Sequence, residues 1–219
     1  DGVAMFTTRL ISRDPDPKRR VIGYFDALED ALQRYDGLPL DAYGFACTGS
    51  SYCIDPVIET AAIARLEGIY DFPIVTAAAA IAEALGGLHA RRVALCSPYP
   101  DWLSGLSQIY WQQAGFEIVA CQRIETPGTE LRGIYTLSSA DAEPVVRALA
   151  ATPCDAIVLT GTGMPSLPLI AALQDAFTVP MISSNLCLAA ALMQRLNIDN
   201  AEQGPHPLIN GWQARLARL

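Results

Sequence analysis

Two stretches of the sequence end in similar turns of small residues, and only the first of these turns contains a thiol. Residues 41–51 read DAYGFACTGSS and residues 155–165 read DAIVLTGTGMP, an alignment that places Cys47 opposite Gly161. A cysteine between a strand and a helix lies where the helix dipole lowers the pKa of its thiol, and the thiolate is the reactive form. Cys47 is therefore a candidate nucleophile or acid/base. The alternative interpretation is a small buried residue in a tight turn.

Both turns also offer backbone N–H donors, because a small-residue turn that leads into a helix leaves its first N–H groups unpaired. Two such turns that face each other suit a small dicarboxylate or an enolate-like intermediate. The second turn, GTGMPS, also resembles the start of a dinucleotide fingerprint, but Ser166 stands where that fingerprint needs its third glycine. We therefore expect no nicotinamide site, and no cofactor.

The likeness of the two stretches belongs to a longer internal repeat. Residues 72–85 (FPIVTAAAAIAEAL) match residues 179–192 (VPMISSNLCLAAAL), and residues 2–11 loosely match residues 115–124. The spacing of about 110 residues divides the chain into two halves of similar design.

Short apolar runs alternate with helical patterns in each half, which is typical of a parallel sheet flanked by helices. We predict an α/β protein in which two flavodoxin-like halves are related by a pseudo-twofold axis, with the active site in the cleft between them. The first half is residues 1–88, with the C-terminal segment as a candidate to pack on it, and the second half is residues 89–219. Strands are expected over residues 3–10, 42–48, 72–77, 91–97, 116–124, 155–161 and 179–184, and helices over residues 20–35, 55–68, 77–88 and 166–177.

The two halves are not equal in their strands. The second half opens with the strand-like run at residues 91–97, which has no counterpart in the first half. An opening strand, roughly twenty to thirty residues long with its loop, is therefore expected upstream of Asp1.

Composition excludes several classes of partner. The net charge is −8, and the only basic cluster is KRR at residues 18–20, which argues against a nucleic-acid surface. Charged residues or prolines interrupt every apolar stretch, so we expect no membrane span and a cytoplasmic protein. The six cysteines are irregularly spaced, and the two histidines, His89 and His206, lie far from any cysteine cluster. This pattern favours free thiols and argues against a metal site. The oligomeric state is left open, with a homo-oligomer as one alternative.

Four stretches of the sequence resemble the aspartate/glutamate racemase superfamily, and within it the branch of maleate cis-trans isomerase and arylmalonate decarboxylase. They are ACTGSSY, TAAAAIAEALGGLHARRVALCSPY, VLTGTGMPSL and PMISSNLCLAAAL, and they cover most of the chain in the right order. The resemblance implies two similar α/β halves with the active site between them, and an enzyme that needs neither metal nor cofactor. Many members carry one cysteine in each half, on opposite faces of the substrate.

The resemblance also implies roles for individual residues. Cys47 matches the first-half catalytic cysteine, while the second-half cysteine should fall at Gly161, where this chain departs from the pattern. In arylmalonate decarboxylases the single cysteine resembles the second-half position, which is the reverse of this chain. Cys187 is a candidate substitute, with helix packing as its alternative role. The expected substrate-binding residues are Thr48, Gly49, Tyr99, Gly161, Thr162, Gly163, Tyr24 and Asn185.

These observations predict a cofactor-independent isomerase of the maleate cis-trans isomerase or Asp/Glu racemase type, acting on a small carboxylic or dicarboxylic acid. Cys47 serves as nucleophile or acid/base, because addition to an activated double bond needs the first-half thiol that this chain keeps. One alternative is a lyase similar to arylmalonate decarboxylase, with single-thiol protonation by Cys47. A second alternative is a carboxylate-binding protein without catalysis.

Overall fold

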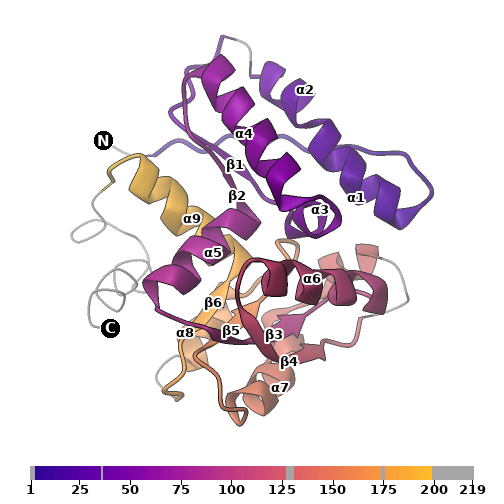
Figure 1. Cartoon of the computed structure of the whole chain (residues 1–219), viewed down its shortest axis with the longest axis vertical. Coiled ribbons are helices and arrows are strands. Elements are labelled where there is room, and N and C mark those ends of the chain that lie inside the picture. The colour runs from indigo at the N-terminus through magenta and orange to yellow at the C-terminus, as the bar shows by residue number, and fades with distance from the viewer. Residues whose placement is uncertain (1–2, 36, 127–130, 174–175, 199–219) are drawn as a thin grey trace.

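The strands form two parallel sheets of unequal size within the described residues, which are 3–35, 37–126, 131–173 and 176–198 of the computed structural model (Figure 1). The smaller sheet pairs β1 (Tyr43–Phe45) with β2 (Ile74–Thr76). The larger sheet has the order β4-β3-β5-β6, with every neighbouring pair parallel. Its strands are β3 (Arg92–Ser97), β4 (Glu117–Arg123), β5 (Ala156–Leu159) and β6 (Met181–Ser183). The predicted α/β class with parallel strands is confirmed.

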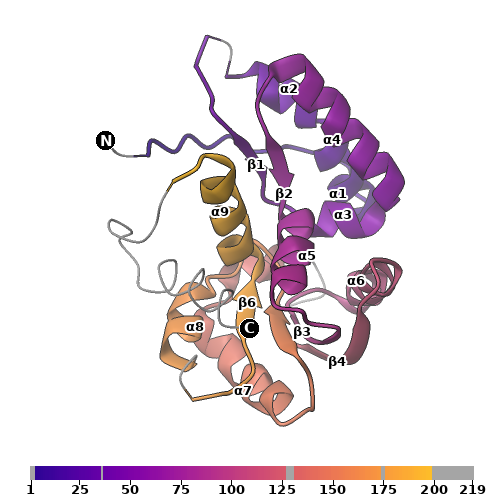
Figure 2. The same cartoon turned by 60° about the vertical axis from the view of Figure 1, so that its left-hand side comes forward.

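Helices cover the larger sheet on both faces. The helix α6 (Asp101–Gln113) lies on one side of the strands, and α7 (Ser139–Ala150) and α8 (Leu167–Leu173) lie on the other (Figure 2). This arrangement follows from right-handed crossovers, because the chain moves in one direction from β3 to β4 and in the opposite direction from β4 through β5 to β6. A short 3-10 helix, η1 (Leu131–Thr136), precedes α7.

The first part of the chain forms a smaller layer around β1 and β2. Its helices are α1 (Pro17–Asp26), α2 (Leu28–Gln33), α3 (Thr48–Cys53) and α4 (Pro56–Tyr70). Local sequence explains the start of α4, since the Asp55 side chain caps the helix by accepting from the Val57 N–H and Pro56 occupies the first turn. Phe25, Leu28 and Phe45 are buried together in a small core between these helices and β1.

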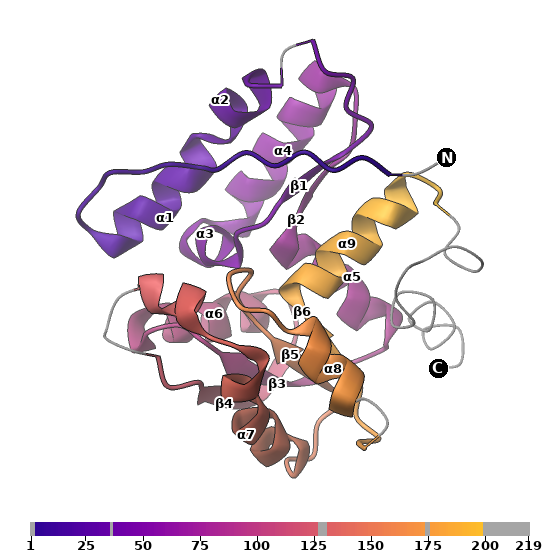
Figure 3. The same ribbon diagram turned by 180° about the vertical axis from the view of Figure 1, so that it is seen from behind.

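Two helices, one from each half of the sequence, join the layers. The helix α5 (Ala77–Gly87) packs along α9 (Ser184–Arg195), and α9 also contacts β1 and β2 (Figures 2 and 3). The approach of α9 to β1 is close, because a Cβ added at Gly44 would lie 2.8 Å from Cδ1 of Leu192. Both helices contribute side chains to the large core that also contains β3 and β5.

The predicted strand over residues 3–10 is wrong. Residues 3–14, here called the N-terminal arm, have no helix or strand and cross the molecule from the side of α9 to the start of α1 (Figure 3). Val3, Met5 and Phe6 are 67%, 87% and 56% exposed, whereas a strand of a covered parallel sheet would bury them. An apolar run becomes a strand only when a neighbouring strand accepts its hydrogen bonds, and the sequence pattern could not show that partner.

Candidate functional site

Cys47 occupies the junction between β1 and α3. The strand ends at Phe45, the helix begins at Thr48, and Cys47 takes the N-cap position with extended backbone angles of φ −148° and ψ 86°. The Ser50 hydroxyl donates a hydrogen bond to Cys47 Sγ at 3.1 Å. Cys47 as a residue is half-buried. The strand expected over residues 42–48 is present but ends at Phe45. The residues after Cys47 form the short helix α3, where the sequence indicated only a turn before a helix at residues 55–68.

The electrostatic environment of Cys47 differs from the prediction. Burial raises the pKa of the Cys47 thiol, and the donors of Ser50 and Gly49 offset this effect only in part. The prediction of a lowered pKa is wrong, because the effect of burial is larger than that of the donors. In the free site the group is therefore a neutral thiol at neutral pH, able to donate a proton.

A buried hydrogen bond links the Cys47 turn to the other half of the sequence. The Thr48 Oγ1 and Tyr99 hydroxyl oxygens lie 2.5 Å apart, and both residues are buried. Tyr99 follows β3, which lies between β4 and β5 in the larger sheet. Burial raises the pKa of the Tyr99 phenol well above its usual range, so this group stays protonated and can donate.

The second small-residue turn meets the first one directly. The Thr162 hydroxyl donates to the Ala46 carbonyl at 2.7 Å, and the Asn185 side-chain amide donates to the Thr162 carbonyl at 3.1 Å. Asn185 comes from the first turn of α9. The structure thus brings together two predicted residues, Thr162 and Asn185, beside the residue that precedes Cys47.

Gly161 lies next to the Tyr99 hydroxyl. A Cβ added at Gly161 would be 3.7 Å from that oxygen, but only 2.6 Å from Cγ of Pro98. The backbone of Gly161 has φ +92°, a conformation that side-chain-bearing residues rarely adopt. A side chain at the position opposite Cys47 in the repeat would therefore strain the backbone and meet the ring of Pro98.

Tyr135 was missed by the sequence analysis and covers the outer side of the second turn. A Cβ added at Gly163 would lie 2.9 Å from Cε1 of Tyr135, so the ring rests against this glycine. Burial raises the pKa of the Tyr135 phenol, and Cys47 and Tyr24 add to this effect. Tyr24 is half-buried on α1. No motif marks Tyr135 in the run LRGIYT, so no signal in the sequence could have found it.

A buried acid lies behind the Cys47 helix. Glu59 of α4 is 6% exposed and accepts a hydrogen bond from the Ser51 hydroxyl at 2.6 Å. Burial raises the pKa of Glu59, with the Ser51 and Thr76 hydroxyls opposing the shift. Glu59 in turn contributes to raising the Cys47 pKa. The sequence pattern predicts a helix over residues 55–68 and gives no sign of a buried acid.

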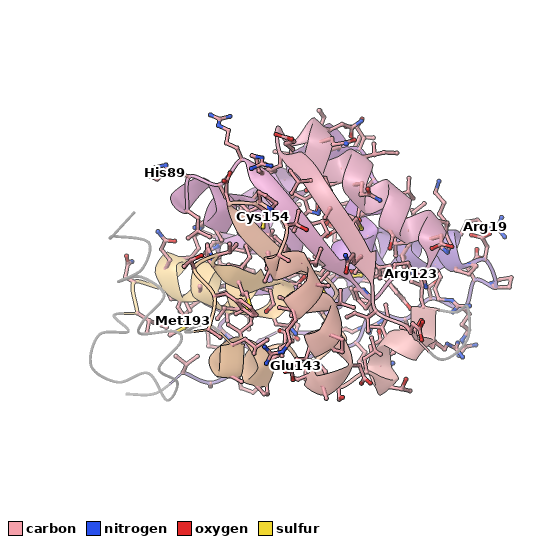
Figure 4. All side chains as sticks on the ribbon, turned by 90° about the horizontal axis from the view of Figure 1, so that it is seen from below. Arg19, His89, Arg123, Glu143, Cys154 and Met193 are labelled. Atoms are coloured by element: carbon pink, nitrogen blue, oxygen red, sulfur yellow. The ribbon has the colours of Figure 1, made fainter. Side chains whose placement is uncertain are left out.

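Other candidate groups lie away from these turns. Cys154 and His89 precede β5 and β3, so they lie at the amino-terminal ends of the strands (Figure 4). Cys187 is buried within α9, where burial raises its pKa well above the usual range. A groove of about 510 Å³ between α1 and α4 is lined mainly by apolar side chains and does not include Cys47.

Wherever the structure describes the chain, no three His, Cys, Asp or Glu side chains gather in a way that could hold a metal ion. His206 lies outside the described residues. None of the described helices combines the length and the apolar character that crossing a membrane would require.

The fold and the site together define an α/β protein in which a cysteine-bearing turn meets a second turn of small residues. Two solved structures share this fold. The maleate isomerase of Pseudomonas putida S16 with maleate aligns with a TM-score of 0.79 at 21% identity, over 89% of this chain and 79% of that one. The maleate cis-trans isomerase of Nocardia farcinica, with a covalently bound succinylcysteine intermediate, gives a TM-score of 0.74 at 21% identity, over 88% of this chain and 80% of that one.

Sequence comparison gives the family. The profile of the family described as arylmalonate decarboxylase matches residues 23–209, and the chain belongs to this family. A curated relative, the maleate isomerase of Pseudomonas putida strain KT2440, is 26% identical over 140 residues, which are 64% of this chain. The match spans 55% of that relative, so the chain covers only about half of its length. The predicted resemblance to the maleate isomerase and arylmalonate decarboxylase branch is confirmed.

Proposed function

We propose that this chain is a cofactor-independent enzyme of the maleate cis-trans isomerase type, acting on a small carboxylic or dicarboxylic acid through Cys47. The observation that carries the proposal is the meeting of the two turns at the hydrogen bond from Thr162 to the Ala46 carbonyl. It sets Cys47 beside donors from both halves of the sequence. The proposal includes the pseudo-twofold relation of the two halves, in which Cys47 and Gly161 occupy equivalent positions.

The geometry supports a carboxylate at the first turn. The backbone N–H groups of Thr48 and Gly49 lie in the first turn of α3, where they have no helical partner. The Tyr99 phenol, held by Thr48 and kept protonated by burial, is a further donor beside them. Together they would stabilise the negative charge that develops on the carboxylate oxygens.

Isomerisation then uses Cys47 as a nucleophile. A bond forms from Sγ to one carbon of the double bond, while the π-electron pair moves toward the neighbouring carboxylate and gives an enediolate. The thiol proton passes to the substrate carboxylate as the bond from sulfur to carbon forms, because the resting thiol is neutral. The remaining single bond between the two carbons rotates. Expulsion of the sulfur restores the double bond in the trans geometry and returns the proton. A succinylcysteine intermediate in the Nocardia farcinica enzyme supports this covalent route.

A second candidate function is favoured by the neutral state of the thiol. A protonated Cys47 can deliver its proton to the enediolate left when a malonate loses carbon dioxide, as in an arylmalonate-decarboxylase-like lyase. The family profile is consistent with this reaction. A carboxylate-binding protein without catalysis is the third candidate. The hydrogen bond from Ser50 to the thiol argues for retained chemistry at this position.

The test separates all three candidates. The protein is incubated in heavy water with maleate or phenylmalonate, products are followed by proton NMR, and intact mass is recorded. Conversion of maleate to fumarate, lost in Cys47→Ser and kept in Cys53→Ser, supports the isomerase. Loss of carbon dioxide from phenylmalonate alone supports the lyase. Binding without turnover of either acid would leave the carboxylate-binding protein, and the proposal would be wrong.

A further inference from the structure

Glu59 is a buried acid that the proposed mechanism does not use. No other Asp, Glu, Lys or Arg is buried in the described part of the chain. A buried charge costs free energy unless hydrogen bonds or an ion pair compensate for the lost water. None of the ion pairs between described residues includes Glu59. Its position in the first turn of α4 offsets part of this cost through the helix dipole.

The Glu59 carboxylate binds a side chain of the helix that follows Cys47. The Ser51 hydroxyl donates to Glu59 Oε1 at 2.6 Å, and Ser51 is completely buried. Ser51 comes four residues after Cys47, which is about one turn of helix. The hydrogen bond therefore joins α4 to the helical turn that begins at the reactive thiol.

The helix α3 depends on such contacts because it is short. A helix of six residues is too short to be stable by itself, so its neighbours decide its orientation. Figure 1 shows α3 between α6 and the pair α1 and α4. Toward α1, the Ser50 hydroxyl oxygen lies 2.6 Å from the Val21 carbonyl oxygen. Toward the end of β3, Thr48 pairs with Tyr99. The hydrogen bond to Glu59 is the corresponding attachment to α4.

We propose that Glu59 is a positioning residue for Cys47, which acts through Ser51 by fixing the orientation of α3. The proposal rests on the proposed function, in which the Cys47 sulfur attacks a bound double bond. Such an attack needs close and aligned atoms, and a misplacement of about 1 Å can cost about a hundredfold in rate. Binding of the carboxylate is less sensitive, because a hydrogen bond accepts a broad range of donor directions at the oxygen. Loss of the attachment should therefore lower kcat more than it changes KM.

The test compares the kinetics of maleate isomerisation in variants that keep or break this hydrogen bond. Glu59→Gln keeps a side-chain oxygen that can accept from Ser51, so its kcat should stay within about threefold of the wild type. Glu59→Leu and Ser51→Ala each break the bond. They should each lower kcat by about thirtyfold and change KM by less than about threefold. An equal loss of kcat in Glu59→Gln and Glu59→Leu would overturn the proposal.

A double variant tests whether the two residues act through one another. Ser51→Ala combined with Glu59→Leu should lose no more kcat than the worse single variant, because both changes remove the same hydrogen bond. Losses that multiply would show that the residues act independently, and the positioning role would be wrong. Ser51→Ala and Glu59→Gln alone give the comparison if Glu59→Leu does not fold, because Ser51→Ala breaks the bond and Glu59→Gln keeps it.

Glu67 provides a matched control on the same helix. Its carboxylate accepts from the Ile74 N–H at 2.8 Å, which joins α4 to β2 instead of α3. Glu67→Leu should lower stability in urea and leave kcat within about threefold of the wild type. If Glu67→Leu lowers kcat as much as Glu59→Leu, the effect comes from loosened packing of α4 and the proposal fails.

Alkylation of Cys47 by iodoacetamide at pH 8 gives a second measurement that needs no turnover. Donors of Ser50 and Gly49 in α3 stabilise the thiolate, so a shift of α3 should weaken them. Ser51→Ala should therefore slow alkylation by about threefold, whereas Glu59→Gln should not slow it.

The two measurements keep the proposals apart. If the alkylation rates follow this pattern but no acid is turned over, the proposed function fails and the positioning role stands. Turnover that depends on Cys47, with wild-type kcat and alkylation in Ser51→Ala, would leave the function and overturn the positioning role.

Discussion

The two small-residue turns have similar sequences and different local structures. At the first turn, Cys47 has an extended backbone and its thiol accepts a hydrogen bond from Ser50. At the second turn, Gly161 has φ +92° and the ring of Pro98 fills the space where a side chain would start. The second turn therefore differs from the first by more than the exchange of a cysteine for a glycine. The surrounding backbone and packing have closed the position to any side chain.

The threonines of the two turns also differ in what they hold. The Thr48 hydroxyl pairs with Tyr99 within the site, whereas the Thr162 hydroxyl bonds to the backbone carbonyl of Ala46. The first turn thus uses its side chain to hold the Tyr99 phenol in place. The second uses its side chain to fasten the two turns together. The sequence repeat aligns Thr48 with Thr162 and so predicts equal roles for them, but their side chains make different hydrogen bonds.

Loss of the Cys47 thiol should have the largest effect. Cys47→Ser should lower turnover of the preferred acid by about ten thousandfold or more, because a covalent nucleophile or proton donor is lost. The control is Cys187→Ser, which alters a thiol buried in α9 and should stay within about threefold of the wild type. Steady-state kinetics on both variants provide the measurement. Similar losses in the two variants would contradict the assignment of chemistry to the first turn alone.

Adding a side chain at the second turn should cost stability. Gly161→Ala should lower the free energy of unfolding by about 2–4 kcal/mol, from the strained backbone and the contact with Pro98. Gly49→Ala is the matched change at the first turn, where the added Cβ would meet Leu103 at an ordinary 3.4 Å. It should change the unfolding free energy by less than about 1 kcal/mol. Urea unfolding measures both, and equal stability of the two variants would show that the second position is not closed.

Alanine variants of the two threonines should have different effects, because Thr48 holds the Tyr99 phenol and Thr162 joins the two turns. Thr48→Ala should lower kcat by about thirtyfold, because it leaves the buried Tyr99 hydroxyl without its partner and free to turn from the substrate. Thr162→Ala should lower kcat by less than about fivefold, and its main effect should be on stability. The measurement is the ratio of the kcat values of the two variants, which shows which threonine contributes more to catalysis. A larger loss in Thr162→Ala would mean that the second turn orients the substrate through its side chain.

The smallest effect concerns the pH dependence of Cys47 alkylation. Because burial raises the pKa of this thiol, the thiolate is scarce at neutral pH and the rate with iodoacetamide should keep rising through pH 9. Ser50→Ala removes a donor that stabilises the thiolate, so it should raise the pKa further and slow alkylation at pH 8 by about fivefold. A plateau below pH 8 in the wild type would show instead that the terminus of α3 lowers the pKa.

Cys53 provides the internal standard for this measurement. It lies at the end of α3, where burial raises its pKa to about 11. The rate of Cys53 alkylation should therefore also increase with pH up to about pH 11, both in the wild type and in Ser50→Ala. A change at Cys53 in Ser50→Ala would indicate a general distortion of α3.

Much of the fold was predictable because local sequence controls it. Apolar runs such as residues 91–97 form strands wherever the sheet covers them. Side chains such as Asp55 and Ser183 then fix where the following helices begin. The N-terminal arm shows the limit of this reasoning. Its pattern is strand-like, but a strand also needs a partner that local sequence does not specify.

The sequence by itself determined that Cys47 lies in a turn between a strand and a helix, and that a similar turn without a thiol follows later in the chain. Only the tertiary structure decided the direction of the Cys47 pKa shift, since burial raises this pKa and Glu59, which comes from another helix, adds to the effect. It also decided that Pro98 closes the space at Gly161 and that Tyr135 covers Gly163. These contacts depend on packing between segments distant in sequence, and side-chain packing has no periodic signature along the chain.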